Sequence, residues 1–151
     1  MINDLWYKNA VIYCLSVGTF MDANADGIGD FQGLMRRLDY LHGLGITAIW
    51  LMPFQSSPCR DDGYDIADYY GVNSRHGTLG DFVEFTHGAK QRGIRVIIDL
   101  VVNHTSDQHR GFALADLCKV HSRDSVCHLL RRAGRVSLIP LLKISASSSR
   151  R

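Results

Sequence analysis

Three nearly continuous apolar runs, at residues 10–17, 47–54 and 94–102, divide the first 109 residues of the chain. None of them alternates between apolar and polar positions, as a strand exposed on one face would. Such strands, when helices join them, predict a parallel sheet that is buried on both faces. Crossover connections in a parallel sheet are right-handed. This pattern alone fits either the start of a β/α barrel or a small doubly wound sheet.

The segment between the first two runs predicts a helix over residues 33–43. Its apolar residues, Leu34, Leu38 and Leu41, recur at helical spacing. Gly43 and Gly45 are expected to end this helix, because glycine is the usual residue after a helix C-terminus.

A second helix is predicted between Thr78 and Gly93, after a polar loop over residues 55–73. Thr78 is a candidate N-cap, and Asp81 places negative charge at the positive end of the helix dipole. The inward stripe of this helix is expected to consist of Leu79, Phe82, Val83 and Thr86.

Charge divides the chain into two parts. Residues 1–109 carry 8 Lys and Arg against 13 Asp and Glu, a net charge of −5, whereas residues 110–151 carry 9 against 2, a net charge of +7. Thirteen of the 14 aromatic residues also precede residue 110. We interpret residues 110–151 as an unrelated, basic and disordered tail. No aromatic platform or known motif accompanies its charge, so a nucleic-acid partner is not expected.

Composition places the protein among ordinary globular chains, with 46% hydrophobic and 21% charged residues. No apolar run reaches the roughly 18 residues that cross a bilayer, and residues 1–8 lack the basic-then-apolar order of a signal peptide. A cytoplasmic protein is therefore expected. Four cysteines without metal-finger spacing are expected to be free thiols there.

An acidic loop after the first strand predicts a calcium site. Its sequence, DANADGIGD, places oxygen side chains at alternate positions, and the carbonyl of the residue after Gly27 can complete the set. The candidate ligands are Asp22, Asn24, Asp26, Ile28 and Asp30. Gly33 stands where an EF-hand needs a bidentate glutamate, so that motif is rejected. A solvated acidic turn is the alternative interpretation.

Two further segments place candidate sugar-binding groups near the carboxyl ends of strands, where β/α barrels build their active sites. RDDGYD, at residues 60–65, offers a tyrosine face beside carboxylates, and DLVVNH, at residues 99–104, ends in a histidine. Each also has a plain structural interpretation. The first segment can be an Asp/Gly turn, Asp99 a carboxylate paired with an arginine, and His104 a histidine with its hydrogen bonds satisfied.

These segments occur in the order and at the separations of a known family. DANADGIGD, GITAIWLMP, DDGYDIADYYGV and DLVVNHTSDQH together resemble the alpha-amylase superfamily, glycoside hydrolase family 13, and within it most of all the trehalose synthase group. The resemblance covers residues 6–109. It implies that residues 1–109 are the first three βα units of a (β/α)8 TIM barrel, the N-terminal part of a catalytic domain.

The resemblance also implies roles for individual residues. Tyr64 would stack on the glucose unit at the cleaved bond, while Asp61 and His104 would bind its hydroxyl groups. Asp99 would support the active site by orienting groups around the nucleophile. The acidic loop would be the structural calcium site of the oligoglucosidase and trehalose synthase branch.

The catalytic residues of the family are expected to be absent from these 151 residues. Retaining glycosidases need two carboxylates about 5 Å apart, and the family carries them after its fourth and fifth strands. Residues 110–151 contain only Asp116 and Asp124 and no glutamate, and neither aspartate has the family's strand-end context. Where the family continues from SDQH with Pro-Trp-Phe, this chain reads Arg-Gly-Phe, which suggests an out-of-frame tail.

We therefore expect part of an enzyme that acts on α-glucosides, with maltose-to-trehalose isomerisation or α-glucoside hydrolysis as the parent activity. The chain alone is expected to be inactive. A non-catalytic remnant that binds calcium or carbohydrate is the alternative.

Overall fold

The computed structural model describes residues 5–112, which form two compact units. The first unit contains residues up to 56 together with 69–100, and the second contains residues 57–68 together with those from 101 onward. The tail was predicted to be disordered over residues 110–151. Residues 113–151 lie outside the described residues, so the structure does not test this prediction for them. No helix within residues 5–112 has the length and apolarity needed to traverse a bilayer.

The centre of the first unit is a three-stranded parallel sheet. Its strands are β1 (Ile12–Leu15), β2 (Ala48–Leu51) and β5 (Arg95–Ile98), in the spatial order β1-β2-β5. Each strand lies within one of the three apolar runs. β2 pairs in parallel with β1 on one side and with β5 on the other. The predicted parallel sheet is confirmed.

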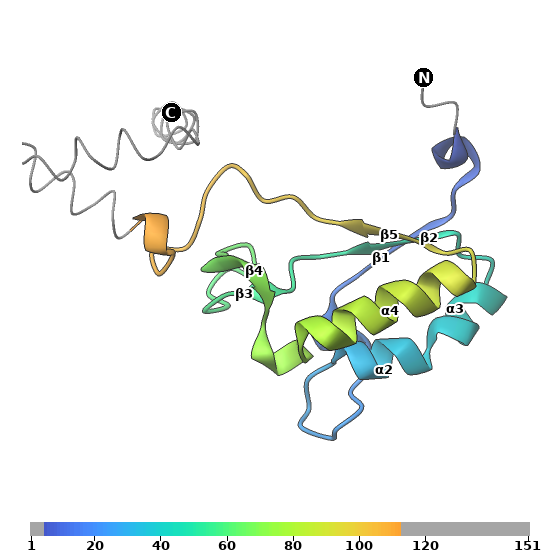
Figure 1. The fold of residues 1–151 in the computed structure, drawn as a ribbon, viewed down its shortest axis with the longest axis horizontal. Helices are drawn as coiled ribbons and strands as arrows, with labels where there is room; N and C mark the ends of the chain where they lie inside the picture. The colour runs from blue at the N-terminus through green and yellow to red at the C-terminus, as the bar shows by residue number, and fades with distance from the viewer. Residues whose placement is uncertain (1–4, 113–151) are drawn as a thin grey trace, which may run out of the picture. The chain divides into compact units, whose positions relative to one another are not determined.

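Helices α2 (Phe31–Arg36), α3 (Leu38–Gly43) and α4 (Leu79–Gln91) connect these strands. They lie together on one side of the sheet (Figure 1). The shorter elements are η1 (Trp6–Asn9), α1 (Val17–Phe20), β3 (Gln55–Ser56), β4 (Asp68–Val72) and η2 (Ser74–His76).

The helix predicted over residues 33–43 is two helices that begin earlier. Asp30 is the N-cap of α2, since its Oδ1 accepts the Gly33 N–H at 2.6 Å. At Arg37 the backbone leaves helical geometry (φ −103°, ψ 2°), which separates α2 from α3. Gly45 adopts φ 78° two residues after Gly43, as expected for a helix that ends in a left-handed residue.

The inward stripe predicted for α4 is wrong in part. Leu79 and Val83 are more than half exposed, at 56% and 57%, whereas Phe85 and Ala89 are fully buried. Phe82 does pack against the core. The buried face of α4 contains Phe85, whose ring contacts the Phe31 ring of α2. Val83 lies on the exposed face of the same helix.

The predicted polar loop over residues 55–73 contains β3 and β4, which pair in a separate two-stranded sheet. The Asn73 N–H also donates to the Phe54 carbonyl at 2.9 Å. Aromatic and β-branched residues such as Tyr69, Tyr70 and Val72 favour extended backbone. Sequence inspection missed this small sheet because polar residues surround them.

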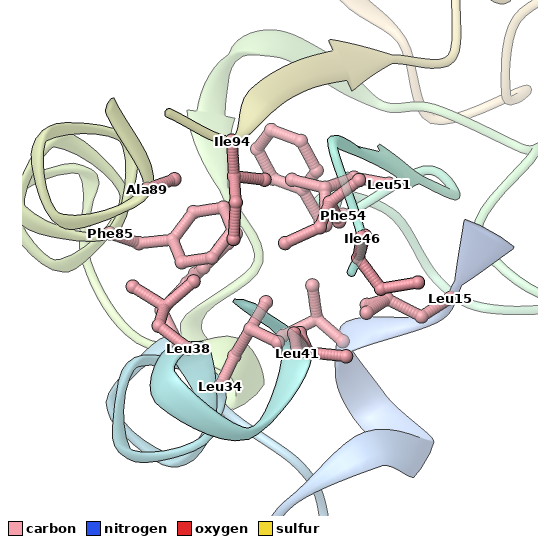
Figure 2. Packing of buried hydrophobic residues seen from close by; sticks show 13 residues of the cluster. Leu15, Leu34, Leu38, Leu41, Ile46, Leu51, Phe54, Phe85, Ala89 and Ile94 are labelled. Atoms are coloured by element: carbon pink, nitrogen blue, oxygen red, sulfur yellow. The ribbon is translucent and has the colours of Figure 1, made fainter. Parts of the chain in front are cut away.

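One hydrophobic cluster joins the sheet to its helices. Phe31 is fully buried and its ring contacts those of Phe54, Phe82 and Phe85, with centroids 5.3, 5.5 and 5.8 Å apart. Figure 2 shows the surrounding side chains from strands and helices converging on the same interior: Leu15, Leu34, Leu38, Leu41, Ile46, Leu51, Phe54, Phe85, Ala89 and Ile94. The packed side of the sheet is therefore the helix side.

The other side of the sheet is less covered. Cys14 and Trp50 are neighbours in the β1–β2 register, and both are exposed, Trp50 by 41%. The prediction of a sheet buried on both faces therefore holds only on the helix side within residues 5–112. Within residues 5–112, Cys14 and Cys59 are both exposed and neither forms a disulfide.

Replacing Thr78 with alanine is expected to destabilise the chain by about 1 kcal/mol. The Thr78 hydroxyl accepts the Asp81 N–H at 3.2 Å, and the Asp81 carboxylate accepts the Thr78 N–H at 2.7 Å, so the predicted cap is a complete capping box. Urea denaturation measures the loss. Thr86→Ala, a control in the interior of the same helix, is expected to be neutral or slightly stabilising; an equal loss in both variants would contradict the cap.

Candidate functional site

The acidic loop of the first unit is wrapped around its own oxygen atoms. Asp22 accepts the backbone N–H groups of Asn24, Ala25 and Gly27 at 2.7–2.9 Å. Asn24 Oδ1 accepts the N–H of Asp26 at 2.9 Å, and Asp26 Oδ1 accepts that of Ile28 at 2.8 Å. The alternating side chains therefore hold the turn in one conformation.

The electrostatics of this loop favour an ionised carboxylate. The Gly27 N–H is the main cause that lowers the pKa of Asp22, and it outweighs the opposing effect of desolvation. Asp30, at the end of the loop, is buried and accepts the N–H groups of Ala23 and Gly33 with its two oxygens. Asp30 thus closes the loop and begins α2 at the same time.

All five predicted calcium ligands lie in this one loop, and their oxygens are the hard donors that calcium prefers. Within residues 5–112, however, no three His, Cys, Asp or Glu side chains are grouped closely enough to hold a metal ion among them. A calcium ion here would therefore depend on the mixed set, in which the Asn24 amide and the Ile28 carbonyl join the carboxylates. The donor types and their alternation fit calcium.

His76 fastens the far end of this loop. Its Nδ1 lies 3.2 Å from the Gly29 carbonyl oxygen, and its ring packs directly over Gly18. Burial lowers the pKa of His76; Arg75 acts in the same direction, while the Gly29 carbonyl and Asp30 oppose them. The neutral imidazole is thus the form that the folded chain prefers.

Acidification is expected to weaken the fold through His76. Because its pKa is lower in the folded chain than the usual 6.5, the unfolded chain takes up the proton first as pH falls. The contribution to stability is complete above about pH 6.5 and is lost as pH falls below it. Urea denaturation at pH 7.5 and 5.5 measures the loss. His76→Gln should remove part of this pH dependence, and an unchanged dependence would contradict the assignment.

The second unit holds the predicted sugar-contacting residues on two segments. Asp61 and Tyr64 lie on the loop 57–66, where the Tyr64 N–H donates to the Asp61 carbonyl at 2.8 Å. Asp61 is exposed and Tyr64 is partly buried. The turn between them requires left-handed backbone, with φ 49° at Asp62 and 95° at Gly63.

His104 lies on the second segment, exposed and beside Asn103, whose amide nitrogen is 3.3 Å from the imidazole Nδ1. Two contacts join this segment to the first. The Ser106 N–H donates to the Ile66 carbonyl at 2.9 Å, and Arg60 forms an ion pair with Asp107 at 3.2 Å. The structure therefore brings together the two segments that carry Asp61, Tyr64 and His104.

Asp99, the predicted supporting carboxylate, belongs to the first unit and follows β5 directly. Its backbone N–H donates to the Leu51 carbonyl at 3.1 Å, so the chain leaves β5 beside the end of β2. This places it at the carboxyl end of a parallel strand, as expected for a barrel active-site residue.

Asp65 was not singled out from the sequence. Its carboxylate accepts the Ser57 hydroxyl at 2.6 Å and the Arg60 N–H at 2.9 Å. Partial burial alone would raise the pKa of Asp65, but these hydrogen bonds outweigh it and hold the pKa below its usual value. Its partners lie five and eight residues away in an aperiodic loop, so no sequence spacing could reveal them.

Comparison with known proteins identifies the family. Residues 12–126 match the alpha-amylase family, described as alpha amylase, catalytic domain. The chain belongs to the alpha-amylase family. The parallel sheet β1-β2-β5 with its helices accordingly corresponds to the N-terminal part of a TIM barrel of glycoside hydrolase family 13.

Several members of the alpha-amylase family are closely similar to the chain. The trehalose synthase of Thermus thermophilus is 59% identical over 112 residues, which are 74% of this chain and 11% of that protein. The oligo-1,6-glucosidase of Bacillus cereus is 48% identical over 107 residues, 71% of this chain and 19% of that protein.

Among solved structures, the trehalulose synthase MutB from Pseudomonas mesoacidophila superposes with a TM-score of 0.70 at 51% identity, covering 72% of this chain and 19% of MutB. A mutant of MutB has been solved in complex with the substrate sucrose, and another in complex with glucose. The chain thus spans only part of its relatives: 11% of the trehalose synthase of Thermus thermophilus and 21% of the glucan 1,6-alpha-glucosidase of Streptococcus pneumoniae.

Proposed function

We propose that the chain contributes the first part of the sugar pocket of an enzyme that acts on α-glucosides. In this proposal Tyr64 stacks on the glucose unit, while Asp61 and His104 bind its hydroxyl groups. Asp99, which follows β5, is the proposed supporting carboxylate. The parent reaction is maltose-to-trehalose isomerisation or α-glucoside hydrolysis.

One observation carries this proposal: the loop of Asp61 and Tyr64 is tied to the segment of His104 by the contacts Ser106–Ile66 and Arg60–Asp107. An aromatic face with hydroxyl-binding groups around it is the arrangement that a sugar ring needs. Relatives that carry the names trehalose synthase and oligo-1,6-glucosidase support an α-glucoside as the ligand.

The 151-residue polypeptide is proposed to bind its ligand without cleaving it. Retaining cleavage needs a nucleophile and an acid/base on two carboxylates about 5 Å apart. Glu84 is the only glutamate in these 151 residues, and it lies exposed on α4. No residue of the chain is assigned a catalytic role, and the alternative to an enzyme is a non-catalytic remnant that binds calcium or carbohydrate.

Titration of the purified chain with maltose, followed by amide NMR, tests the proposed pocket. Saturable shifts of the amide resonances are expected at residues 61–64 and 103–105. Asp61→Asn or His104→Gln should weaken binding about tenfold, because each removes a hydrogen bond to the sugar. Asp39→Asn, on α3, is the control. Binding that ignores both pocket variants would refute the assignment.

We further propose that the loop of residues 22–30 binds calcium as a structural ion. The support is its all-oxygen donor set and the ordered turn that the side chains of Asp22, Asn24 and Asp26 maintain. A bound ion would neutralise these carboxylates and fix the entry to α2. It would supply stability, and the loop contains nothing that indicates chemistry.

Calcium is expected to raise the free energy of unfolding, by about 2.7 kcal/mol at a hundred times its dissociation constant. Thermal denaturation with calcium and with a chelator measures this. Asp26→Asn should abolish the effect, while Glu84→Gln, which removes an exposed carboxylate from α4, should leave it intact. Identical melting curves with and without calcium would mean that the loop is a solvated acidic turn.

A further inference from the structure

The loop that carries Asp61 and Tyr64 has a strained backbone conformation. Cys59 and Asp62 adopt φ values of 56° and 49°, in the left-handed region that non-glycine residues avoid, and Gly63 follows at 95°. Such a conformation persists only where surrounding contacts impose it. The loop therefore needs an internal fastening.

The carboxylate of Asp65 supplies that fastening from both of its oxygens. Oδ1 accepts the Ser57 hydroxyl at 2.6 Å and Oδ2 accepts the Arg60 N–H at 2.9 Å. Ser57 Oγ in turn accepts the Cys59 N–H at 2.8 Å. These three bonds hold both sides of the left-handed Cys59 and close the segment 60–65 into a ring.

Asp61 and Tyr64 lie inside this ring. The Tyr64 N–H is bonded to the Asp61 carbonyl at 2.8 Å, so the two side chains move with one turn. Because the ring closes at Asp65, the position of that turn depends on the carboxylate next to Tyr64. The exposed ion pair of Arg60 with Asp107 acts on the same loop from outside, but its side chains are 65% and 58% exposed, and such pairs contribute little.

We propose that Asp65, through Ser57, is a positioning residue for α-glucoside binding: it sets the loop geometry in which Asp61 and Tyr64 meet the sugar, without touching the sugar itself. This inference rests on the proposed function of the loop. It assigns a role to Asp65, which lies at the C-terminal end of the segment and accepts hydrogen bonds from Ser57 and Arg60 at its N-terminal side.

Three variants of the full chain test the assignment by titration with maltose. Ser57→Ala removes the hydroxyl bridge, and Asp65→Asn removes the charge and half of the acceptor capacity; each is expected to weaken maltose binding about tenfold or more, as losing a hydrogen bond to a charged group does. Ser57→Thr keeps the hydroxyl and is expected to bind within about threefold of the unchanged chain. Glu84→Gln, which neutralises an exposed carboxylate on α4 outside this loop, is the control.

A second readout separates positioning from folding. Ser57→Ala is expected to shift the amide resonances of Arg60 and Tyr64, and Ser57→Thr to restore them, while the thermal midpoint of the chain changes little. The inference is overturned if Ser57→Ala and Asp65→Asn bind maltose like the unchanged chain, or if binding falls only in proportion to lost folded protein.

Failure of the proposed function looks different. If the unchanged chain binds no maltose, the sugar assignment fails, and the amide resonances alone decide the role of Asp65. Shifts in Ser57→Ala that Ser57→Thr reverses would then support Asp65 as the fastening of the loop. Unchanged resonances at Arg60 and Tyr64 would overturn that as well.

Discussion

Replacing Phe31 with alanine is expected to destabilise the chain by about 3–5 kcal/mol, the usual cost of deleting a buried aromatic ring. Phe31 is fully buried, and its ring contacts the rings of Phe54, Phe82 and Phe85. Removing it leaves three aromatic neighbours around a cavity that links α2 to α4 and the end of β2. A total stability of about 5–15 kcal/mol is typical of single domains, so the loss would be a large fraction of the total.

Urea denaturation followed by circular dichroism measures this effect. Phe31→Leu should recover part of the loss because it refills much of the cavity. Tyr70→Ala removes an aromatic ring that is 92% exposed and serves as the control, with little change expected. A Phe31→Ala chain within about 1 kcal/mol of the unchanged chain would contradict the central place of this ring in the core.

The second large effect is expected from Gly33→Ala. Gly33 lies inside α2, where alanine would ordinarily stabilise a helix by about 0.5–1 kcal/mol. Here an added Cβ would overlap the carbonyl oxygen of Met21 and lie 2.8 Å from its carbonyl carbon. Backbone cannot yield as a flexible side chain does, so a loss of about 2 kcal/mol or more is expected instead.

Gly43→Ala is the matched control for this prediction. Gly43 is also helical, at the end of α3, and a Cβ there would meet nothing within 4 Å. The two glycine-to-alanine changes are therefore expected to differ in sign, a small gain at Gly43 and a loss at Gly33. Chemical denaturation of both variants decides this, and two gains would show that Met21 does not pack against α2 as described.

Much of the fold could be predicted from the hydrophobic pattern, because each of the three parallel strands lies within a long apolar run. Thr78 and Asp81 were recognisable as a helix start because capping depends on residues only three positions apart. Phe31 was not predicted as a core residue of this helix. The predicted helix began at residue 33, before Leu34, whereas α2 begins at Phe31 after its N-cap Asp30. The stripe with Leu79 and Val83 was wrong because the partners of Phe85 come from distant segments.

The site was predictable to a different degree. The alternating polar residues of the loop from Asp22 to Asp30 are recognisable in the sequence. In the structure the side chains of Asp22, Asn24 and Asp26 accept backbone N–H groups and stabilise the turn. The roles of Asp61, Tyr64 and His104 came from family resemblance, because single polar residues in loops have no periodicity. Asp65 lies in the candidate segment RDDGYD, but its partners could not be recognised from the sequence, because its bonds to Ser57 and Arg60 form only in the folded loop.

The most direct test of the account combines binding and turnover in one sample of the 151-residue chain with maltose. The expected result is saturable binding that Tyr64→Ala weakens and Tyr70→Ala does not, with neither glucose nor trehalose produced. Product formation by the purified chain, with contaminating enzyme excluded, would contradict the proposal of binding without cleavage. Equal binding by the Tyr64→Ala and unchanged chains would contradict the sugar pocket itself.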